Sequence, residues 1–224
     1  MNLPTPHKPI LYLITDRRSF LRKTDSETAA CRMQIETIAE AAAAGCQLIQ
    51  IREKDLSDKD LAEFTRQAIA VARPLGAKIL VNDRLNVAFA TEADGVHLRV
   101  TSLPAREVRQ KVQQKGVEDF LIGVSTHSLA EAETAAGGGA DFIVCGPVFD
   151  TPSKREFGQP LGLGRFAAIC QTVSIPVLAL GGINLQNFRE PLRLGASGIA
   201  AIGLFNNTES LSLTIKTLLE PTPI

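Results

Sequence analysis

Polar side chains end an apolar run at Gln50, Arg52 and Lys54. In a β-strand, successive side chains alternate between two faces, so these three would point the same way. Ile49 and Ile51 would point the other way, into a covering layer. Two cations and an amide on one strand face favour a pocket for an anion. The alternative is a strand end that carries ordinary surface charges into solvent, and this stretch alone does not decide between them.

The chain around this stretch alternates short β-branched runs with alanine-rich helical segments. The predicted strands are Ile10–Asp16, Gln47–Glu53, Lys78–Asp83, Gly95–Leu98, Leu121–His127, Phe142–Phe149, Pro176–Gly182 and Gly198–Phe205. The predicted helices are Glu27–Ala44, Ser57–Arg73, Leu85–Thr91, Leu103–Gln114, Leu129–Ala136, Leu161–Thr172, Asn184–Leu194 and Glu209–Leu219. Plausible helix caps are Ser57, Ser102, Ser128 and Asn184.

Strict alternation of strand and helix indicates βαβ units around a parallel sheet. We therefore predict an α/β protein of one domain over residues 1–224, a single (β/α)8 TIM barrel. A doubly wound open sheet also alternates, but no Gly-x-Gly-x-x-Gly follows the first strand, where Thr15, Asp16 and Arg17 stand instead. In a barrel, the chemistry lies at the carboxyl ends of the strands. Polar, charged or glycine residues mark every one of those ends.

Composition is typical of a globular protein with a full core. The chain is 45% hydrophobic and carries 24 basic and 24 acidic residues, so no nucleic-acid or membrane partner is expected. The opening residues lack a cationic segment followed by an apolar one, which predicts a cytoplasmic location. Four widely spaced cysteines, Cys31, Cys46, Cys145 and Cys170, are expected to be reduced apolar fillers.

Glycines at the last two strand ends predict a phosphate site. Gly181 and Gly182 close strand seven, and Ile202 and Gly203 close strand eight. Glycine lets an anion approach backbone N–H groups, and the loops after strands seven and eight are the usual phosphate cradle of these barrels. The alternative is that glycine only makes a tight turn. A turn would explain Gly181 or Gly182 alone, but it explains less well why both occur together with Gly203.

The loop after strand six supplies hydroxyl and cationic groups beside that cradle. Thr151, Ser153 and Lys154 suit a second phosphate group or a diphosphate. The loop is long and continues through residues 157–160, which include Gly158 and Pro160, a composition that would suit a lid. A solvated surface turn is the alternative.

Taken together, these motifs resemble the thiamine phosphate synthase/TenI superfamily over nearly the whole chain. The resemblance rests on Gln50-x-Arg52-x-Lys54, Asn82-Asp83, residues 95–98 (Gly-Val-His-Leu), residues 123–127 (Gly-Val-Ser-Thr-His), Gly139-Ala140-Asp141, Thr151-x-Ser153-Lys154 and Gly181-Gly182. Synthases of this family join a hydroxymethylpyrimidine diphosphate to a thiazole phosphate and release diphosphate.

The resemblance implies a role for each matching residue. The diphosphate and the pyrimidine would be held by Gln50, Arg52, Lys54, Asn82 and Lys154. Ser125 would contact the leaving diphosphate, and Asp83 would bind Mg²⁺. Thr151, Ser153 and Gly182 would hold the thiazole phosphate together with the strand-eight end at Ile202 and Gly203.

One segment departs from the synthase pattern. After Gly-Val-His-Leu a synthase usually continues Gly-Gln-x-Asp, whose aspartate is a second Mg²⁺ ligand, whereas this chain has Arg99 and ends the motif at Ser102. The same segment and His127 are similar to the TenI branch, in which some proteins are thiazole tautomerases with an acid/base histidine at the position of His127. As a further alternative, His127 is a hydrogen-bonded strand-end residue without a chemical role.

Three hypotheses about function follow. The first is thiamine phosphate synthesis, with thiazole tautomerisation as the runner-up. The second is a non-catalytic binder of thiazole or thiamine phosphate. The third, an isomerase of sugar phosphates, is disfavoured by the Thr-x-Ser-Lys loop. The expected partners are small phosphorylated molecules, and a homo-oligomer is left open.

Overall fold

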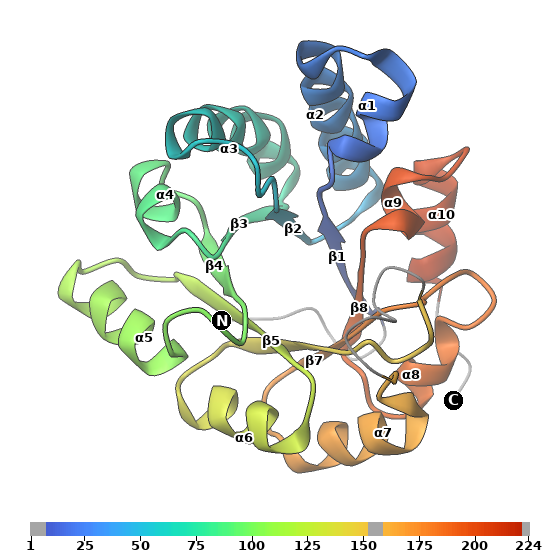
Figure 1. The fold of residues 1–224 in the computed structure, drawn as a ribbon. Helices are drawn as coiled ribbons and strands as arrows, with labels where there is room; N and C mark the ends of the chain where they lie inside the picture. Colours follow the sequence, from blue (N-terminus) through green and yellow to red (C-terminus); the bar gives the residue numbers. More distant parts are fainter. Residues whose placement is uncertain (1–7, 152–158, 221–224) are drawn as a thin grey trace.

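The computed structural model describes residues 8–151 and 159–220. Eight parallel strands close into a barrel in the order β1 to β8, and Figure 1 shows the helices arranged around it. The predicted (β/α)8 barrel is therefore confirmed. No helix in the described part of the chain has the length and apolar composition needed to cross a membrane.

The elements have the following bounds. The strands are β1 (Ile10–Ile14), β2 (Leu48–Ile51), β3 (Lys78–Asn82), β4 (Gly95–Leu98), β5 (Leu121–Thr126), β6 (Phe142–Cys145), β7 (Val177–Leu180) and β8 (Gly198–Ala201). The helices are α1 (Arg18–Thr24), α2 (Glu27–Ala44), α3 (Asp58–Ala72), α4 (Leu85–Ala90), α5 (Ala105–Gln114), α6 (Leu129–Gly137), α7 (Gly162–Thr172), α8 (Arg189–Arg193), α9 (Gly203–Asn206) and α10 (Leu211–Leu219), with a 3-10 turn, η1 (Arg73–Leu75).

Most strands stop earlier than predicted, and two short helices were not predicted. The chain bends away from the sheet after Ile14 and Ile51, so the polar residues that follow these strands lie on loops. Helix α1 follows β1 directly, and α9 replaces the predicted end of β8. The apolar stretch around Phe205 fits a helix as well as a strand, since periodicity does not separate the two in short runs.

Local capping explains why several helices begin where they do. The Ser26, Ser57 and Ser128 hydroxyls accept backbone N–H groups at the starts of α2, α3 and α6. The predicted caps Ser102 and Asn184 are wrong as helix caps, because Pro104 precedes α5 and Phe188 precedes α8. Asn184 instead accepts the N–H groups of two residues in the turn that follows β7.

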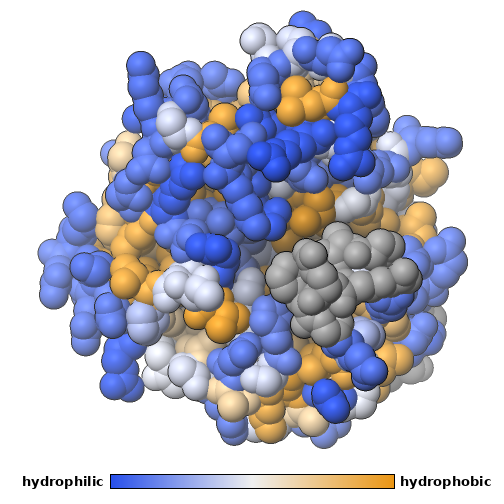
Figure 2. Space-filling view, in the orientation of Figure 1, coloured by the Kyte–Doolittle hydropathy of each residue, from blue (hydrophilic) through white to orange (hydrophobic). Residues whose placement is uncertain are grey.

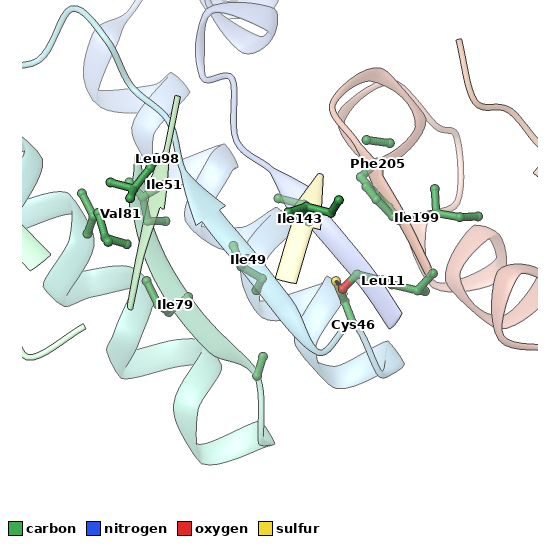
Figure 3. Close-up of a cluster of buried hydrophobic side chains, with 14 of the residues drawn as sticks. Leu11, Cys46, Ile49, Ile51, Ile79, Val81, Leu98, Ile143, Ile199 and Phe205 are labelled. Carbon is green, nitrogen blue, oxygen red and sulfur yellow. Dashed lines mark hydrogen bonds between the residues drawn. The ribbon is translucent and has the colours of Figure 1, made fainter. Parts of the chain in front are cut away.

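Two apolar layers hold the barrel together. The larger lies between the strands and the helices, and Figure 3 labels some of its members, including Leu11, Ile49 and Ile199. The smaller fills the barrel interior and includes Tyr12, Phe142 and Leu178. Because Ile49 and Ile51 are buried in the outer layer, Gln50 projects into the interior, as the alternation predicted.

Glycine makes room for the large interior side chains. Tyr12 packs edge-on against Phe142, with ring centroids 5.5 Å apart, and the ring of His97 lies 5.7 Å from Tyr12. A Cβ at Gly123 would lie 2.9 Å from His97 Nδ1 and closer still to the Phe142 ring. The interior therefore accepts no side chain at position 123.

Carboxylates pin the strands at the opposite end of the barrel from the predicted site. Asp94 precedes β4 and accepts the backbone N–H of Ile79 at 2.8 Å, while Asp141 precedes β6 and accepts that of Ile122 at 2.7 Å. Gln47 does the same for Leu11 at 2.8 Å. The Gly139-Ala140-Asp141 motif therefore serves strand register, as Asp94 does on the neighbouring strands.

Replacing Gly123 with Ala is expected to destabilise the fold by about 1–3 kcal/mol, because the added methyl overpacks the interior. Chemical denaturation followed by circular dichroism measures this. Gly137→Ala is the matched control: the site lies in α6 with nothing within 4 Å of the added Cβ, so we expect a gain of about 0.5–1 kcal/mol. Equal stabilities for the two variants would show that the interior is not closely packed at Gly123.

Candidate active site

Arg52 lies where the ends of three strands converge. It follows β2 and is half-buried, and its backbone N–H donates to the Thr15 hydroxyl at 2.9 Å. Burial lowers the pKa of Arg52, while the charge of Asp16 opposes this shift and that of Arg99 adds to it. The loops after β1, β2 and β4 therefore place charged groups within interaction distance of one another.

The turn after Arg52 is fixed by contacts of the buried Arg17 with Glu53 and Asp55, which the sequence analysis missed. Arg17 is 3% exposed and Glu53 4%, and the backbone N–H of Arg17 donates to both Glu53 carboxylate oxygens at 3.2 Å. The Arg17 guanidinium also donates to Asp55 at 2.9 Å. Burial raises the pKa of Glu53, and the hydrogen bonds from Thr15 and Arg17 oppose that rise.

Lys54 lies in the turn that these contacts hold. The strand ends at Ile51, so Arg52 and Lys54 both follow it, and the prediction that Gln50, Arg52 and Lys54 alternate along one strand is wrong. The turn exposes Lys54 at the mouth of the barrel, beyond Arg52. Figure 2 shows hydrophilic residues gathered over the half of this face that holds β1 to β4 in Figure 1.

A chain of hydrogen bonds crosses the barrel interior beneath Arg52. The Gln50 amide Nε2 donates to the Tyr12 hydroxyl at 3.1 Å, and that hydroxyl lies 3.3 Å from His97 Nδ1. His97 Nε2 lies 2.8 Å from Ser125 Oγ. Burial, aided by the charge of Arg52, lowers the pKa of His97 to about 3, so its imidazole is neutral at pH 7. Gln50 and Ser125, both predicted site residues, are thus joined through two residues that were not.

Asp83 is held by the segment that departs from the synthase pattern. Its backbone has a φ of 66°, in the left-handed region, and its carboxylate accepts from the Arg99 guanidinium and from the Ser102 hydroxyl. The Arg99 backbone N–H donates to Ser102 Oγ at 2.8 Å, which closes the arrangement. Ser102, predicted to cap a helix, orients Asp83 instead.

These contacts do not fit a metal ion held by the protein. Both Asp83 oxygens already have partners, one of them a cation. Among residues 8–151 and 159–220, no three His, Cys, Asp or Glu side chains gather to hold an ion. Asn82 is half-buried beside Asp83 at the end of β3, opposite His97 on β4, and brings an amide rather than a charge.

His127 lies exposed on the loop after β5. Its Nδ1 bonds the Gly146 carbonyl oxygen, and its backbone N–H donates to Glu131 at 2.6 Å. Because a carbonyl oxygen only accepts, Nδ1 carries a proton, and this bond fixes the orientation of the ring. That arrangement orients a base.

The glycine pair after β7 packs against the loop after β6. Gly181 and Gly182 have φ values of 97° and 66°, and a Cβ at Gly182 would lie 2.7 Å from the Asp150 carbonyl oxygen. Glycine is therefore needed at position 182 both for its backbone and for this close approach. Thr151, half-buried, follows Asp150 directly, so the two predicted parts of the phosphate cradle meet. Ser153 and Lys154 lie outside the described residues.

Buried amides attach the end of β8 to the end of β1. Asn206 in α9 donates to the Ile14 and Ile202 carbonyl oxygens at 3.0 Å each and accepts from Gln34 at 3.2 Å. Gln34 in turn accepts the Asp16 backbone N–H at 3.1 Å. Ile202 and Gly203, at the start of α9, are thereby fixed relative to the end of β1.

A cavity of about 680 Å³ adjoins the mouth between α5 and α6. It shares Arg99, Ser102 and Ser125 with the site, and its other walls include Val124 and Leu103. The volume lies within the range of small-molecule pockets.

The fold and the site define a (β/α)8 barrel that binds phosphorylated small molecules at the carboxyl ends of its strands. Residues 11–205 match the family model described as thiamine monophosphate synthase. The chain belongs to that family.

Individual relatives and a solved structure support the same family. A putative thiamine-phosphate synthase of Geobacter sulfurreducens is 41% identical, over 86% of this chain and 84% of its own length. The thiamine-phosphate synthase of Chlorobium phaeobacteroides is 38% identical over 91% of each chain. Among solved structures, the thiamine phosphate pyrophosphorylase from Pyrococcus furiosus superposes with a TM-score of 0.79, at 33% identity and 95% coverage of both chains.

The Asp83 contacts predict how the protein responds to Mg²⁺. Since Arg99 and Ser102 occupy the carboxylate, we expect calorimetry to detect only weak Mg²⁺ binding to the free protein, and firmer binding when inorganic diphosphate supplies oxygen ligands. Arg99→Gly combined with Ser102→Asp frees Asp83 and adds a carboxylate, so Mg²⁺ affinity of the free protein should rise about tenfold or more. The control is Arg106→Gly, which removes an exposed arginine nearby and should leave the Mg²⁺ affinity unchanged. Tight Mg²⁺ binding by the unmodified free protein would contradict this account of Asp83.

Proposed function

We propose that this chain condenses a hydroxymethylpyrimidine diphosphate with a thiazole phosphate or carboxythiazole phosphate, forming thiamine phosphate and releasing diphosphate. Family membership supports this reaction, and one observation supports it most directly. A hydrogen-bond chain through Tyr12 and His97 links Gln50 to Ser125 beneath Arg52, while Gly182 packs against the loop that carries Thr151. Two phosphorylated substrates each require such a site.

The chemistry requires charge neutralisation rather than a nucleophilic side chain. The bond between the pyrimidine methylene carbon and the diphosphate oxygen breaks, and its electron pair leaves with the diphosphate. The aminopyrimidine stabilises the resulting cation, and the thiazole nitrogen then forms the new C–N bond. Fixed positive groups accelerate such a step by stabilising the charge that develops on the leaving group.

In this proposal, Arg52 and Lys54 hold the diphosphate, with Lys154 contributed by the loop after β6. Arg52 is half-buried and its pKa is lowered by burial, so bringing an anion to it restores favourable pairing. Asn82 and Gln50 bind the pyrimidine, since amides both donate and accept hydrogen bonds.

The second substrate lies at the glycine side of the mouth. Thr151, Ser153 and Gly182 hold the thiazole phosphate, with Ile202 and Gly203 closing the cradle. No step is assigned to Mg²⁺, because the described donor set does not fit a protein-held ion. The acting partners are these small phosphorylated substrates.

Location and assembly are part of the proposal. We propose that the protein works in the cytoplasm, because its four cysteines are free and two of them, Cys46 and Cys145, are buried as small apolar side chains. A homo-oligomer and the absence of a nucleic-acid partner remain predictions.

Arg52→Ala and Lys54→Ala should each cost about 2–4 kcal/mol of transition-state stabilisation, because each removes one electrostatic donor from the diphosphate. Steady-state rates with the two substrates measure this. Lys59→Ala, an exposed lysine on α3, should leave the rate unchanged, and melting curves should show that all three variants fold. If both site variants match the parent rate, the diphosphate pocket lies elsewhere. A parent that binds thiazole phosphate without turnover would instead be a non-catalytic binder.

The His127 geometry favours thiazole tautomerisation as a second candidate. With Nδ1 committed to the Gly146 carbonyl, Nε2 is available as an acid/base. His127→Asn should then abolish aromatisation of the carboxythiazole phosphate while sparing C–N bond formation. Ultraviolet absorbance and product analysis follow the two reactions separately. Equal loss of both activities, or a parent without tautomerase activity, would rule this role out.

A further inference from the structure

The hydrogen-bond chain in the barrel interior has a direction, and its donor end is Gln50. The amide nitrogen of Gln50 donates to the Tyr12 hydroxyl oxygen at 3.1 Å. Tyr12 is fully buried, and burial raises the pKa of its phenol, so the hydroxyl keeps its single proton. Among the described residues, the acceptor that lies within reach of that proton is His97 Nδ1 at 3.3 Å.

The direction is carried through the imidazole. His97 is 2% exposed and neutral, so its ring has one N–H group and one lone pair. Since Nδ1 accepts from Tyr12, the proton resides on Nε2 and is donated to Ser125 Oγ at 2.8 Å. The opposite tautomer would make the Tyr12 oxygen accept from both Gln50 and His97, leaving its proton without an acceptor inside the barrel.

Ser125 is thereby left with a proton to donate. Its oxygen already accepts from His97, and Ser125 lines the cavity that adjoins the mouth. A hydroxyl fixed in this way offers a hydrogen bond to an anionic oxygen and opposes a ligand that only donates.

We propose that Tyr12 and His97 are positioning residues that turn the Ser125 hydroxyl proton toward the ligand, which makes Ser125 a dedicated donor to a phosphate or diphosphate oxygen. The identity of that anion as the leaving diphosphate rests on the proposed function. The hydrogen-bond direction does not, because it is a property of the free protein. The same hydrogen-bond chain requires glycine at position 123, since a Cβ there would displace His97.

The first experiment measures the tautomer of His97 without any substrate. The chain has three histidines, His7, His97 and His127, so nitrogen-15 NMR of labelled protein resolves them, and His7→Asn and His127→Asn assign the other two signals. His97 should carry its proton on Nε2 and should not titrate between about pH 5 and about pH 9. An Nδ1–H tautomer, or titration in that range, would overturn the proposal even if the protein proves to be a synthase.

The second experiment asks whether Tyr12 acts through Ser125. With inorganic diphosphate as the probe in binding calorimetry, Ser125→Ala should weaken affinity about tenfold and Tyr12→Phe about fivefold. In the Ser125→Ala background, Tyr12→Phe should cause less than about a twofold further loss, because the group it orients is gone. Val144→Ala, an interior packing change outside the hydrogen-bond chain, is the control and should lower stability without changing diphosphate affinity.

The outcomes separate the two hypotheses. Additive losses in the double variant would mean that Tyr12 does not act through Ser125, and the positioning role would be wrong. An Nε2–H tautomer with non-additive losses, in a protein that shows no condensation of the two substrates, would leave the positioning role standing and overturn the proposed function alone.

Discussion

The pairing of β1 with β8 closes the barrel, and the site depends on that closure. Ile10 pairs with Gly198, where any side chain would overlap the Ile10 carbonyl oxygen, so glycine lets the first and last strands meet. At the other end of the same pair, Asn206 bonds the Ile14 carbonyl and Gln34. Without this closure the Gly203 end of the phosphate cradle would have no fixed distance from Arg52. A closed sheet thus converts eight separate strand ends into one pocket.

Charges of both signs surround Arg52 at the strand ends. Burial and the charge of Arg52 lower the pKa of His97. The charge of Arg99 lowers the pKa of Arg52, whereas the charges of Asp16 and Glu53 raise it. Glu53 is turned toward Arg17, and Asp83 toward Arg99. A bound diphosphate would therefore meet cations that are held in place and a neutral imidazole that does not add to their repulsion.

The sequence predicted the fold well and the fine geometry of the site less well, for physical reasons. Alternating apolar runs mark strands and helices, and Glu27–Ala44 matches α2 at both ends because Ser26 and Gly45 are strong capping residues. The apolar pattern of the sequence does not reveal which residues far apart in the chain contact one another. Arg17 and Glu53 lie on the loops after β1 and β2, and Tyr12, Gln50 and His97 lie on three strands; only the closed barrel brings these residues together. Tyr12 and His97 carried a signal nonetheless, since polar groups within otherwise apolar strands need partners when buried.

The segment at residues 99–102 shows how a site can change its parts while keeping its charge. In the synthase pattern, two carboxylates and one divalent cation sum to zero net charge. In this chain one carboxylate, Asp83, faces one guanidinium, Arg99, and the neutral Ser102, which also sum to zero. The two arrangements thus have the same net charge, but the cation of this chain is tethered to the backbone. A tethered guanidinium needs no recruitment from solution and presents planar donors to oxygen pairs, whereas Mg²⁺ brings higher charge density and coordinated water. The exchange therefore alters how this corner of the site is assembled more than how it attracts an anion.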